Sequence, residues 1–389
     1  MTGERSNAIY LDHNATTPID PNVFAAMEPF LKDFFGNPSS SEHEHGNVVA
    51  GAVDLAREQV AELLNARAQE ILFTSGCTEA NNLAILGVAR AEQVKRHMVT
   101  SAIEHPAVLE PMRALERQGW RVTYIPVDSA GRVSIESVEE AIEADTALVS
   151  VMAANNEVGT LQPTREIGSL CAARGVLFHC DLAQVTAYEA IDVQRDNIHL
   201  ASISAHKAYG PKGVGALYVR SRRPRVRLAP IMFGGGQERG MRSGTLNAPA
   251  IVGFGEAMSQ ARRKRGDDAV RLRSLTAQFL SSLRAELDGV HLNGHEQFRI
   301  PSNLSLSIDG VEPLALIRHL RGSVSFSASS ACATDKMETS HVLLAMFGDT
   351  SRARQAFRIS PGRYTSQNEM AFAAGRIVEQ AKLLRRSAA

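Results

Sequence analysis

Short apolar runs and amphipathic stretches alternate along the chain from about residue 70 to residue 219. The apolar runs are rich in Val, Ile, Leu and Ala with little polar alternation, which is typical of strands covered on both faces. The pattern predicts strands at 70–76, 97–101, 121–127, 147–154, 176–181, 200–205 and 213–219, and helices at 78–93, 105–119, 134–145 and 165–175. Such alternation indicates a mostly parallel sheet with helices on either side.

The pattern changes near residue 256, where a long helix with a polar face begins. This helix, at 255–287, leads into predicted strands at 303–308, 324–328 and 356–360 and predicted helices at 312–320 and 340–347. Ser366 and Glu369 have the spacing of a capping box and predict the start of a last helix. We therefore expect a large α/β domain at 17–256 and a smaller α+β domain made of 1–16 and 257–389, in which the N-terminal segment packs against the smaller unit.

The composition and net charge argue against a membrane protein and against a nucleic-acid-binding protein. The chain has 389 residues, of which 44% are hydrophobic, and 42 basic residues balance 42 acidic ones. A net charge of zero gives no overall attraction to nucleic acid or to a membrane surface. The N-terminus lacks the apolar segment of a signal peptide, and no apolar run approaches the roughly 20 residues that span a bilayer. We expect a soluble cytoplasmic protein without a membrane or direct nucleic-acid partner.

The cysteine and histidine spacings do not predict a metal site. The four cysteines have no metal-like spacing and argue for a reducing compartment; they are Cys77, Cys171, Cys180 and Cys332. His43 and His45 lie at a spacing that a metal could use, but no cysteines or acids converge on them in the sequence. A basic run at 220–227 lacks interleaved aromatic residues, which favours a solvated hairpin over a nucleic-acid site.

Polar residues follow several of the predicted strands at the end where parallel α/β sheets bind ligands. Residues 74–78 follow a strand and open a helix, so free backbone N–H groups and the helix dipole suit a phosphate. Asp181 ends another strand, and Lys207 and His105 each follow one. Taken singly, such residues are usually caps or solvated ion-pair partners. Together they fit one ligand that needs a phosphate cup, a carboxylate, a stacking ring and an amine, namely pyridoxal phosphate.

Ten ordered motifs over more than 300 residues resemble those of the cysteine desulfurases, nearest the iron–sulphur-assembly type. They are YLDHNATTPID, FGNPSSSEHEHG, ILFTSGCTEANNLAI, EHPAVLEP, NNEVGTLQP, HCDLAQ, SAHKAYGPKGVGALYV, GGGQERGMRSGTLN, SSACAT and FRISPGRYT. These enzymes belong to the class V branch of the fold-type-I pyridoxal-phosphate enzymes. The resemblance implies a large domain with a mostly parallel seven-stranded sheet, a smaller α+β domain and a homodimer.

The resemblance also implies roles for individual residues. Lys207 would bond covalently to the cofactor and move the proton at the substrate α-carbon, and burial beside an aromatic cation would lower its pKa. Asp181 would pair with the pyridinium nitrogen, Gln184 would hydrogen-bond the phenolic oxygen, and His105 would stack on the ring and assist proton transfer. The implied phosphate ligands are Cys77, Thr78, Ser204, His206 and, from a second subunit, Thr245. The implied substrate-binding residues are Asn14, Asn156 and Arg358, the last gripping the α-carboxylate with its two-pronged guanidinium.

Cys332 supplies the remaining element of the resemblance. The matching cysteine lies on a loop, here about 327–340, and attacks the sulfur of bound L-cysteine, giving L-alanine and a persulfide on the enzyme. The alternative of a small core filler is disfavoured by the polar neighbours of Cys332. Cys77 departs from the family pattern, in which alanine is usual at this position.

Two other functions stay open at this level. A selenocysteine lyase would share the cofactor chemistry but would not need the attacking thiol. A non-catalytic scaffold of the same fold is disfavoured by the complete set of cofactor residues. The sulfur acceptor is also open: scaffold proteins of iron–sulphur cluster assembly, transfer-RNA thiolation enzymes and DNA phosphorothioation proteins are all served by enzymes of this kind.

Overall fold

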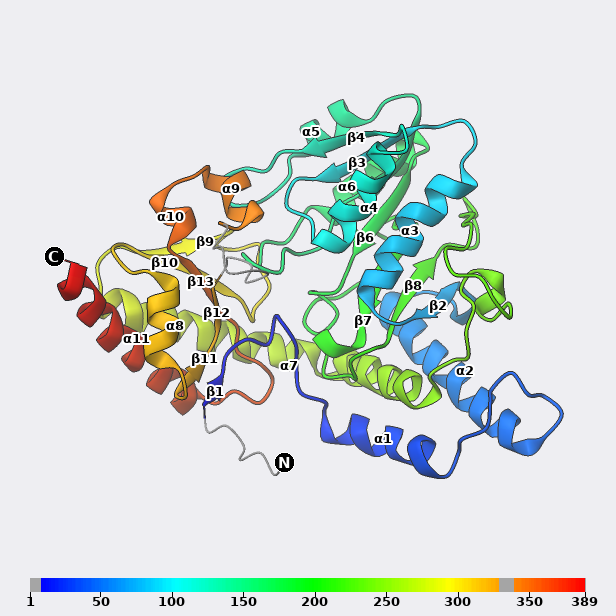
Figure 1. The fold of residues 1–389 in the computed structure, drawn as a ribbon, viewed down its shortest axis with the longest axis horizontal. Helices are drawn as coiled ribbons and strands as arrows, with labels where there is room; N and C mark the ends of the chain where they lie inside the picture. Colours follow the sequence, from blue (N-terminus) through cyan, green and yellow to red (C-terminus); the bar gives the residue numbers. More distant parts are fainter. Residues whose placement is uncertain (1–7, 329–338, 389) are drawn as a thin grey trace.

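A computed structural model describes residues 8–328 and 339–388 of the chain. A seven-stranded sheet forms the centre of the larger part, in the order β2-β8-β7-β6-β5-β3-β4 (Figure 1). Its strands are β2 (Ile71–Thr74), β3 (His97–Ser101), β4 (Arg121–Ile125), β5 (Thr146–Ser150), β6 (Leu177–Asp181), β7 (Leu200–Ser204) and β8 (Gly215–Val219). All neighbours are parallel except β8, which is antiparallel to both β2 and β7. The predicted fold class, a mostly parallel seven-stranded sheet in an α/β fold, is confirmed.

Helices cover both faces of this sheet, as the unbroken apolar strands predict. Leu72, Met98 and Leu148 pack with residues of α3 (Cys77–Ala91) and α4 (Pro106–Glu116), while Phe73, Val99 and Val149 join the core on the other face. Successive residues of a strand point to opposite faces, so each adjacent pair serves both cores. The second core includes α2 (Glu44–Leu64), α6 (Thr164–Arg174) and the first half of α7 (Ala248–Glu286); α1 (Pro21–Lys32) and α5 (Ile135–Ala141) complete this part.

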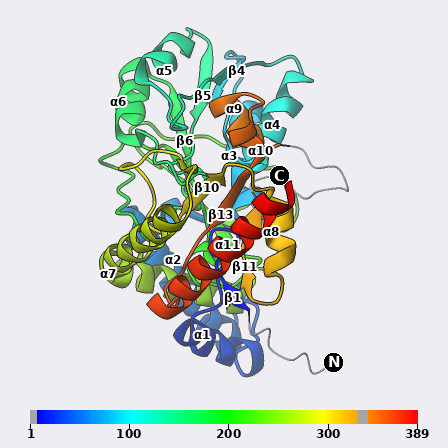
Figure 2. The same ribbon diagram turned by 90° about the vertical axis from the view of Figure 1, so that its left-hand side faces the viewer.

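A smaller antiparallel sheet lies beyond the far end of α7. Its order is β12-β13-β10-β9, and its strands are β9 (Val290–Asn293), β10 (Leu304–Ile308), β12 (Ser327–Ala328) and β13 (Ala356–Ile359). The helices of this part are α8 (Pro313–Leu320), α9 (His341–Phe347), α10 (Ser351–Arg354) and α11 (Gln367–Ala388). Figure 2 views the molecule from this side, with α11 and α8 toward the reader. The predicted α+β character is therefore present.

The N-terminal strand joins the smaller unit rather than the sheet that follows it in sequence. β1 (Ile9–Tyr10) pairs in parallel with β11 (Val324–Ser325), and the Leu11 and Ser360 backbones bond to each other. The predicted last helix carries its capping box, since Glu369 accepts from the Ser366 backbone N–H at 2.7 Å. The predicted boundary at 256 falls inside the continuous helix α7, so the exact division into 17–256 and the remainder stays a prediction.

The helices α1 and α2 were not among the elements predicted from the sequence, which begin near residue 70. The other differences are smaller and have physical reasons. The strand expected at 324–328 is divided into β11 and β12, which pair with different partners. The edge strand β9 was not predicted, because its four residues give too short a pattern of apolar and polar positions. No helix in the described ranges is long and apolar enough to cross a membrane.

Candidate active site

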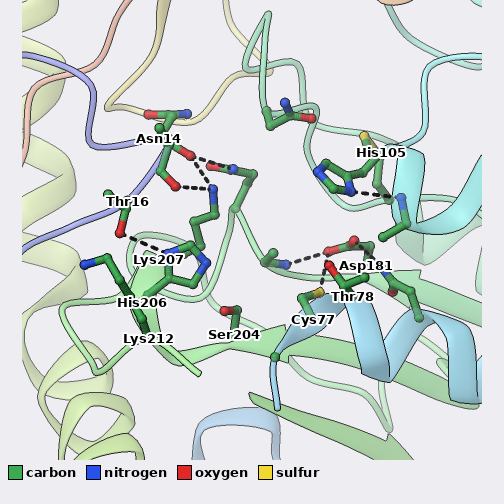
Figure 3. A pocket seen from close by; sticks show the side chains of 18 of the residues that line it. Asn14, Thr16, Cys77, Thr78, His105, Asp181, Ser204, His206, Lys207 and Lys212 are labelled. Atoms are coloured by element: carbon green, nitrogen blue, oxygen red, sulfur yellow. Dashed lines mark hydrogen bonds between the residues drawn. The ribbon is translucent and has the colours of Figure 1, made fainter. Parts of the chain in front are cut away.

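A cavity of about 640 Å³ lies at the carboxyl ends of the strands of the large sheet (Figure 3). β2, β3, β5, β6 and β7 all run in the same direction, so the residues that follow them meet at one edge. Of the predicted site residues, the cavity is lined by Asn14, Cys77, Thr78, His105, Asn156, Asp181, Gln184, Ser204, His206, Lys207 and Arg358. Thr245 is exposed and is absent from the described lining, and Cys332 lies outside the described residues.

Lys207 ends a short 3-10 turn, Ala205–Lys207, directly after β7. Its ammonium group donates to the carbonyl oxygens of Asn14 at 2.6 Å and Ala15 at 2.7 Å. Burial, followed by the nearby Arg358 cation, lowers the pKa of Lys207 to about 8. Roughly a tenth of the amine is therefore neutral, and so nucleophilic, at pH 7, far more than for an unperturbed lysine.

The chain turns sharply after Lys207, and Gly210 permits the turn. A Cβ at Gly210 would lie 2.8 Å from the Cβ of Ala205 and 2.9 Å from its carbonyl oxygen. Such contacts are too close for any residue larger than glycine. The sequence Gly-Pro after Lys207 thus packs the chain back onto the turn and holds the amine in one place.

Asp181, the last residue of β6, faces the same cavity as Lys207 (Figure 3). Its carboxylate accepts from the Asn81 amide at 2.7 Å, from the Ala183 backbone N–H at 2.9 Å and from the Cys77 thiol at 3.4 Å. The Cys77 thiol therefore points to Asp181, and burial followed by this carboxylate raises the pKa of Cys77 well above its usual value. The thiol is protonated and passive, and only the backbone of Cys77 remains for a phosphate.

A buried histidine, His179, connects β6 to both neighbouring strands close to Asp181. His179 lies two residues before Asp181 and bonds Ser150 at 2.8 Å and Ser202 at 2.9 Å, one on each neighbouring strand. Burial lowers the pKa of His179 to about 4, so the ring is neutral. These bonds tie β5, β6 and β7 together just below the cavity.

His105 caps the start of α4 and lines the opposite part of the cavity. Its Nδ1 accepts from the Ala107 backbone N–H at 3.1 Å, which leaves the proton on Nε2. Burial is the main reason why the pKa of His105 is lowered. The preceding residue, Glu104, is fully buried and accepts from Ser101 and from the Met152 N–H, and burial raises the pKa of Glu104 to about 8.

The start of α3 forms an anion-binding end of the cavity. Gly76 precedes the helix and has no side chain to cap it, so the first N–H groups, those of Cys77 and Thr78, are available. Ser204 lines the same end with a buried hydroxyl that has no hydrogen-bond partner within the described chain. His206 bonds Thr16 at 3.1 Å, and burial lowers the pKa of His206 to about 4.

Arg358, on β13, brings the smaller sheet to the cavity. Its guanidinium donates to the Asn156 carbonyl at 2.8 Å and to the Asp12 carboxylate at 2.6 Å. The Nε atom of Arg358 and the Nδ2 atom of Asn14 are buried and lack a partner in the part of the chain that the structure describes. Gln184 donates to the Asn14 carbonyl at 3.1 Å. The two unpaired donors suit a carboxylate ligand.

Several supporting residues were not predicted from the sequence. Asn81 lies four residues after Cys77, on the same face of α3, and a polar residue among apolar ones was the available signal. Asp12 lies inside a quoted motif, but nothing in the sequence indicates that it pairs with a residue 346 positions away. Asn155 orders the turn beside Asn156 by accepting from the Glu157 and Val158 N–H groups.

Comparison with known proteins adds an independent finding. The model of the aminotransferase class-V family matches residues 9–371. A cysteine desulfurase IscS of Anaeromyxobacter dehalogenans (strain 2CP-C) is 47% identical over 378 residues, which cover 97% of this chain and 93% of the relative. A solved NifS-like protein superposes with a TM-score of 0.90 at 37% identity, over 97% of this chain and 100% of that one. A structure described as SspA in complex with cysteine gives a TM-score of 0.81 at 35% identity, over 92% of this chain and 100% of that one.

Proposed function

This chain belongs to the aminotransferase class-V family and is a cysteine desulfurase, and we propose that its cavity holds pyridoxal 5′-phosphate and L-cysteine. The observation that carries the proposal is that Lys207 and Asp181 face one cavity in which three buried side-chain donors have no partner among the described residues. Ser204, Asn14 and Arg358 contribute these donors within the described ranges. Buried polar atoms are almost always hydrogen-bonded, so they favour a ligand that carries acceptors at both ends.

The proposed cofactor contacts follow from these positions. Lys207 would hold the cofactor through its aldehyde group, Asp181 would keep the ring nitrogen protonated, and His105 would stack on the ring. Gln184 hydrogen-bonds the phenolic oxygen. The phosphate is held by the N–H groups of Cys77 and Thr78, by Ser204 and His206, and by Thr245 of a second copy of the chain, which makes the active protein a homodimer.

When bound, the cofactor withdraws electrons from the substrate α-carbon and so weakens the Cβ–S bond. Arg358 and Asn156, with Asn14, hold the α-carboxylate and orient the substrate. Lys207, with a pKa of about 8, can remove and return a proton at the α-carbon, and His105 can donate from Nε2. The Cys332 thiolate attacks the substrate sulfur: the Cβ–S bond breaks, an S–S bond forms and Cβ gains a proton. The products are L-alanine and a persulfide on Cys332.

Replacement of Cys332 by alanine tests this assignment. The Cys332→Ala variant should bind the cofactor and L-alanine as the parent does, while persulfide formation and alanine release from L-cysteine fall to background. Cys171→Ala, which alters a buried cysteine away from the cavity, is the matched control. Unchanged turnover of L-cysteine in Cys332→Ala would refute the role of Cys332, and turnover restricted to selenocysteine would favour a lyase.

The proposed destination of the sulfur is a protein acceptor, such as a scaffold or a thiolation enzyme. We also propose that the protein is located in the cytoplasm. A persulfide-trapping pull-down from the source cells would identify the acceptor.

A further inference from the structure

Glu79 places a carboxylate at the end of the cavity that the start of α3 forms. It lies in the first turn of α3 and lines the cavity together with residues 75–78. One of its oxygens accepts from the Ser75 backbone N–H at 2.7 Å. A negative charge in the first turn stabilises a helix, but here it lies at the proposed phosphate end, where a second and larger negative charge would bind.

Arg242 compensates the charge of Glu79 from a distant segment of the chain. Its Nε donates to one carboxylate oxygen at 2.7 Å and its Nη2 to the other at 3.3 Å, and both side chains are largely buried. Burial works against the ionised form of Glu79, but the hydrogen bonds from Arg242 and Ser75 outweigh it and hold the pKa of Glu79 below its usual value. The two groups therefore form an ion pair without net charge.

The lining of this end offers little other positive charge to a phosphate. Burial, followed by the charges of two nearby lysines, lowers the pKa of His206 to about 4, so its ring is neutral. Lys207 is assigned to the cofactor aldehyde. Lys212 lines the cavity, is exposed and has no ion-pair partner in the described part of the chain. Loss of Arg242 would leave the Glu79 carboxylate to cancel the charge of Lys212.

Attachment of the segment between β8 and α7, to which Arg242 belongs, does not depend on this ion pair alone. Glu238 accepts from the Phe73 backbone N–H of β2 at 2.8 Å, and Arg239 donates to another β2 carbonyl group at 2.9 Å. These contacts hold the segment on the edge of the large sheet. The pairing of Arg242 with an acid of the cavity therefore favours an electrostatic role over a purely structural one.

We propose that Arg242 sets the preference of the cavity for a phosphate-bearing cofactor: it neutralises Glu79, so that the end of the cavity at the start of α3 can accept a dianion. This inference rests on the proposed cofactor, pyridoxal 5′-phosphate. Arg242 acts through Glu79 and is a positioning residue. Without the guanidinium, the Glu79 carboxylate repels the phosphate through a medium whose effective dielectric constant is well below that of water.

Pyridoxal has the ring and the aldehyde of the cofactor but no phosphate, so comparison of the two aldehydes isolates the effect on the phosphate. Equilibrium dialysis against the apoprotein at pH 8 measures both affinities. Arg242→Met should bind pyridoxal 5′-phosphate about tenfold more weakly than the parent and pyridoxal within about twofold of it. Glu79→Gln should bind pyridoxal 5′-phosphate at least as tightly as the parent, because its amide oxygen can still accept from Ser75.

The double variant Glu79→Gln/Arg242→Met separates charge from structure. It lacks the ion pair but leaves no unpaired acid, so its affinity for pyridoxal 5′-phosphate should return to within about threefold of the parent. Arg239→Met is the matched control, because it removes a positive charge and a contact of the same segment while Glu79 keeps its partner. Its affinity for pyridoxal 5′-phosphate should stay within about twofold of the parent.

Three results would each overturn the proposal. Arg242→Met would lose affinity for both aldehydes by the same factor, the double variant would remain as weak as Arg242→Met, or Arg239→Met would lose as much as Arg242→Met. The second result would show that the ion pair acts by holding the segment in place. Failure of the proposed cofactor is distinguishable, since the parent protein itself would then bind pyridoxal 5′-phosphate no more tightly than pyridoxal, and the inference would fall with it.

Discussion

The two sides of the cavity are built in different ways. On the side of the large sheet, Asp181 ends β6 and Lys207 follows the adjacent β7, and the hydrogen bonds of His179 to Ser150 and Ser202 connect β5, β6 and β7. On the side of the smaller sheet, Arg358 depends on Asp12 and Asn156, which come from two distant segments of the chain. The cavity-lining residues of the first side come from neighbouring strands of one sheet. On the second side, β13 is also paired in a sheet, but Arg358 reaches Asp12 and Asn156 on distant segments through contacts of its side chain. We therefore expect substitutions on the first side to affect the cofactor and those on the second to affect substrate and sulfur.

Arg358→Ala is expected to produce the largest difference between the effect on substrate affinity and the effect on cofactor affinity. Loss of the guanidinium removes a two-pronged, charge-assisted contact of about 1.5–3 kcal/mol, so the affinity for L-alanine should fall roughly ten- to a hundredfold. Cofactor affinity should change by less than about threefold, because Asp181, Lys207 and the phosphate end are untouched. Titration of the absorbance spectrum with L-alanine measures the first quantity, and equilibrium dialysis of the cofactor measures the second. If the affinities for L-alanine and for the cofactor fell by the same factor, the two sides of the cavity would not have the separate roles described above.

The pH dependence of cofactor binding tests the side of the cavity formed by the large sheet. Only the neutral Lys207 amine can attack an aldehyde, and burial lowers the pKa of Lys207 to about 8. Below this pKa the neutral fraction falls about tenfold per pH unit, so the rate of cofactor binding to the apoprotein should rise with pH and level off above about 8. Stopped-flow absorbance between pH 6 and 10.5 gives the profile. A rate that is flat up to pH 9, or that keeps rising through pH 10, would disagree with this environment of Lys207.

A smaller effect is expected for Asn81→Ala, which removes one of the three donors to Asp181. A hydrogen bond to a charged group contributes about 1.5–3 kcal/mol, and because Asp181 keeps two of its three donors we expect about half of that, so cofactor affinity should fall roughly three- to tenfold. Asn82→Ala is the matched control, because Asn82 is its neighbour and bonds only the Thr78 carbonyl on its own helix. L-alanine affinity of the cofactor-loaded protein should stay within about twofold in both variants. If Asn81→Ala and Asn82→Ala lost the same cofactor affinity, Asn81 would act only by stabilising α3 and not through its hydrogen bond to Asp181.

The same contrast explains what the sequence could predict. Strand ends of a parallel sheet fall at one edge, so the pattern of apolar runs places Asp181, His105 and Lys207 together without knowledge of side-chain contacts. The motifs of the family then supply their roles. The partnership of Asp12 with Arg358 and Ser327 joins residues more than 300 positions apart, and no periodicity or spacing encodes it. The Cys77 thiol is a further case, since only the structure shows that it faces Asp181.

The most direct test of the central claim is the site at which the cofactor becomes attached. The purified protein, loaded with pyridoxal 5′-phosphate, is reduced with borohydride, digested and mapped by mass spectrometry. The account predicts a single phosphopyridoxyl group on Lys207, and its loss in Lys207→Ala but not in Lys382→Ala, which alters an exposed lysine. Attachment to Lys212 or to scattered surface lysines, with Lys207 unmodified, would contradict the account.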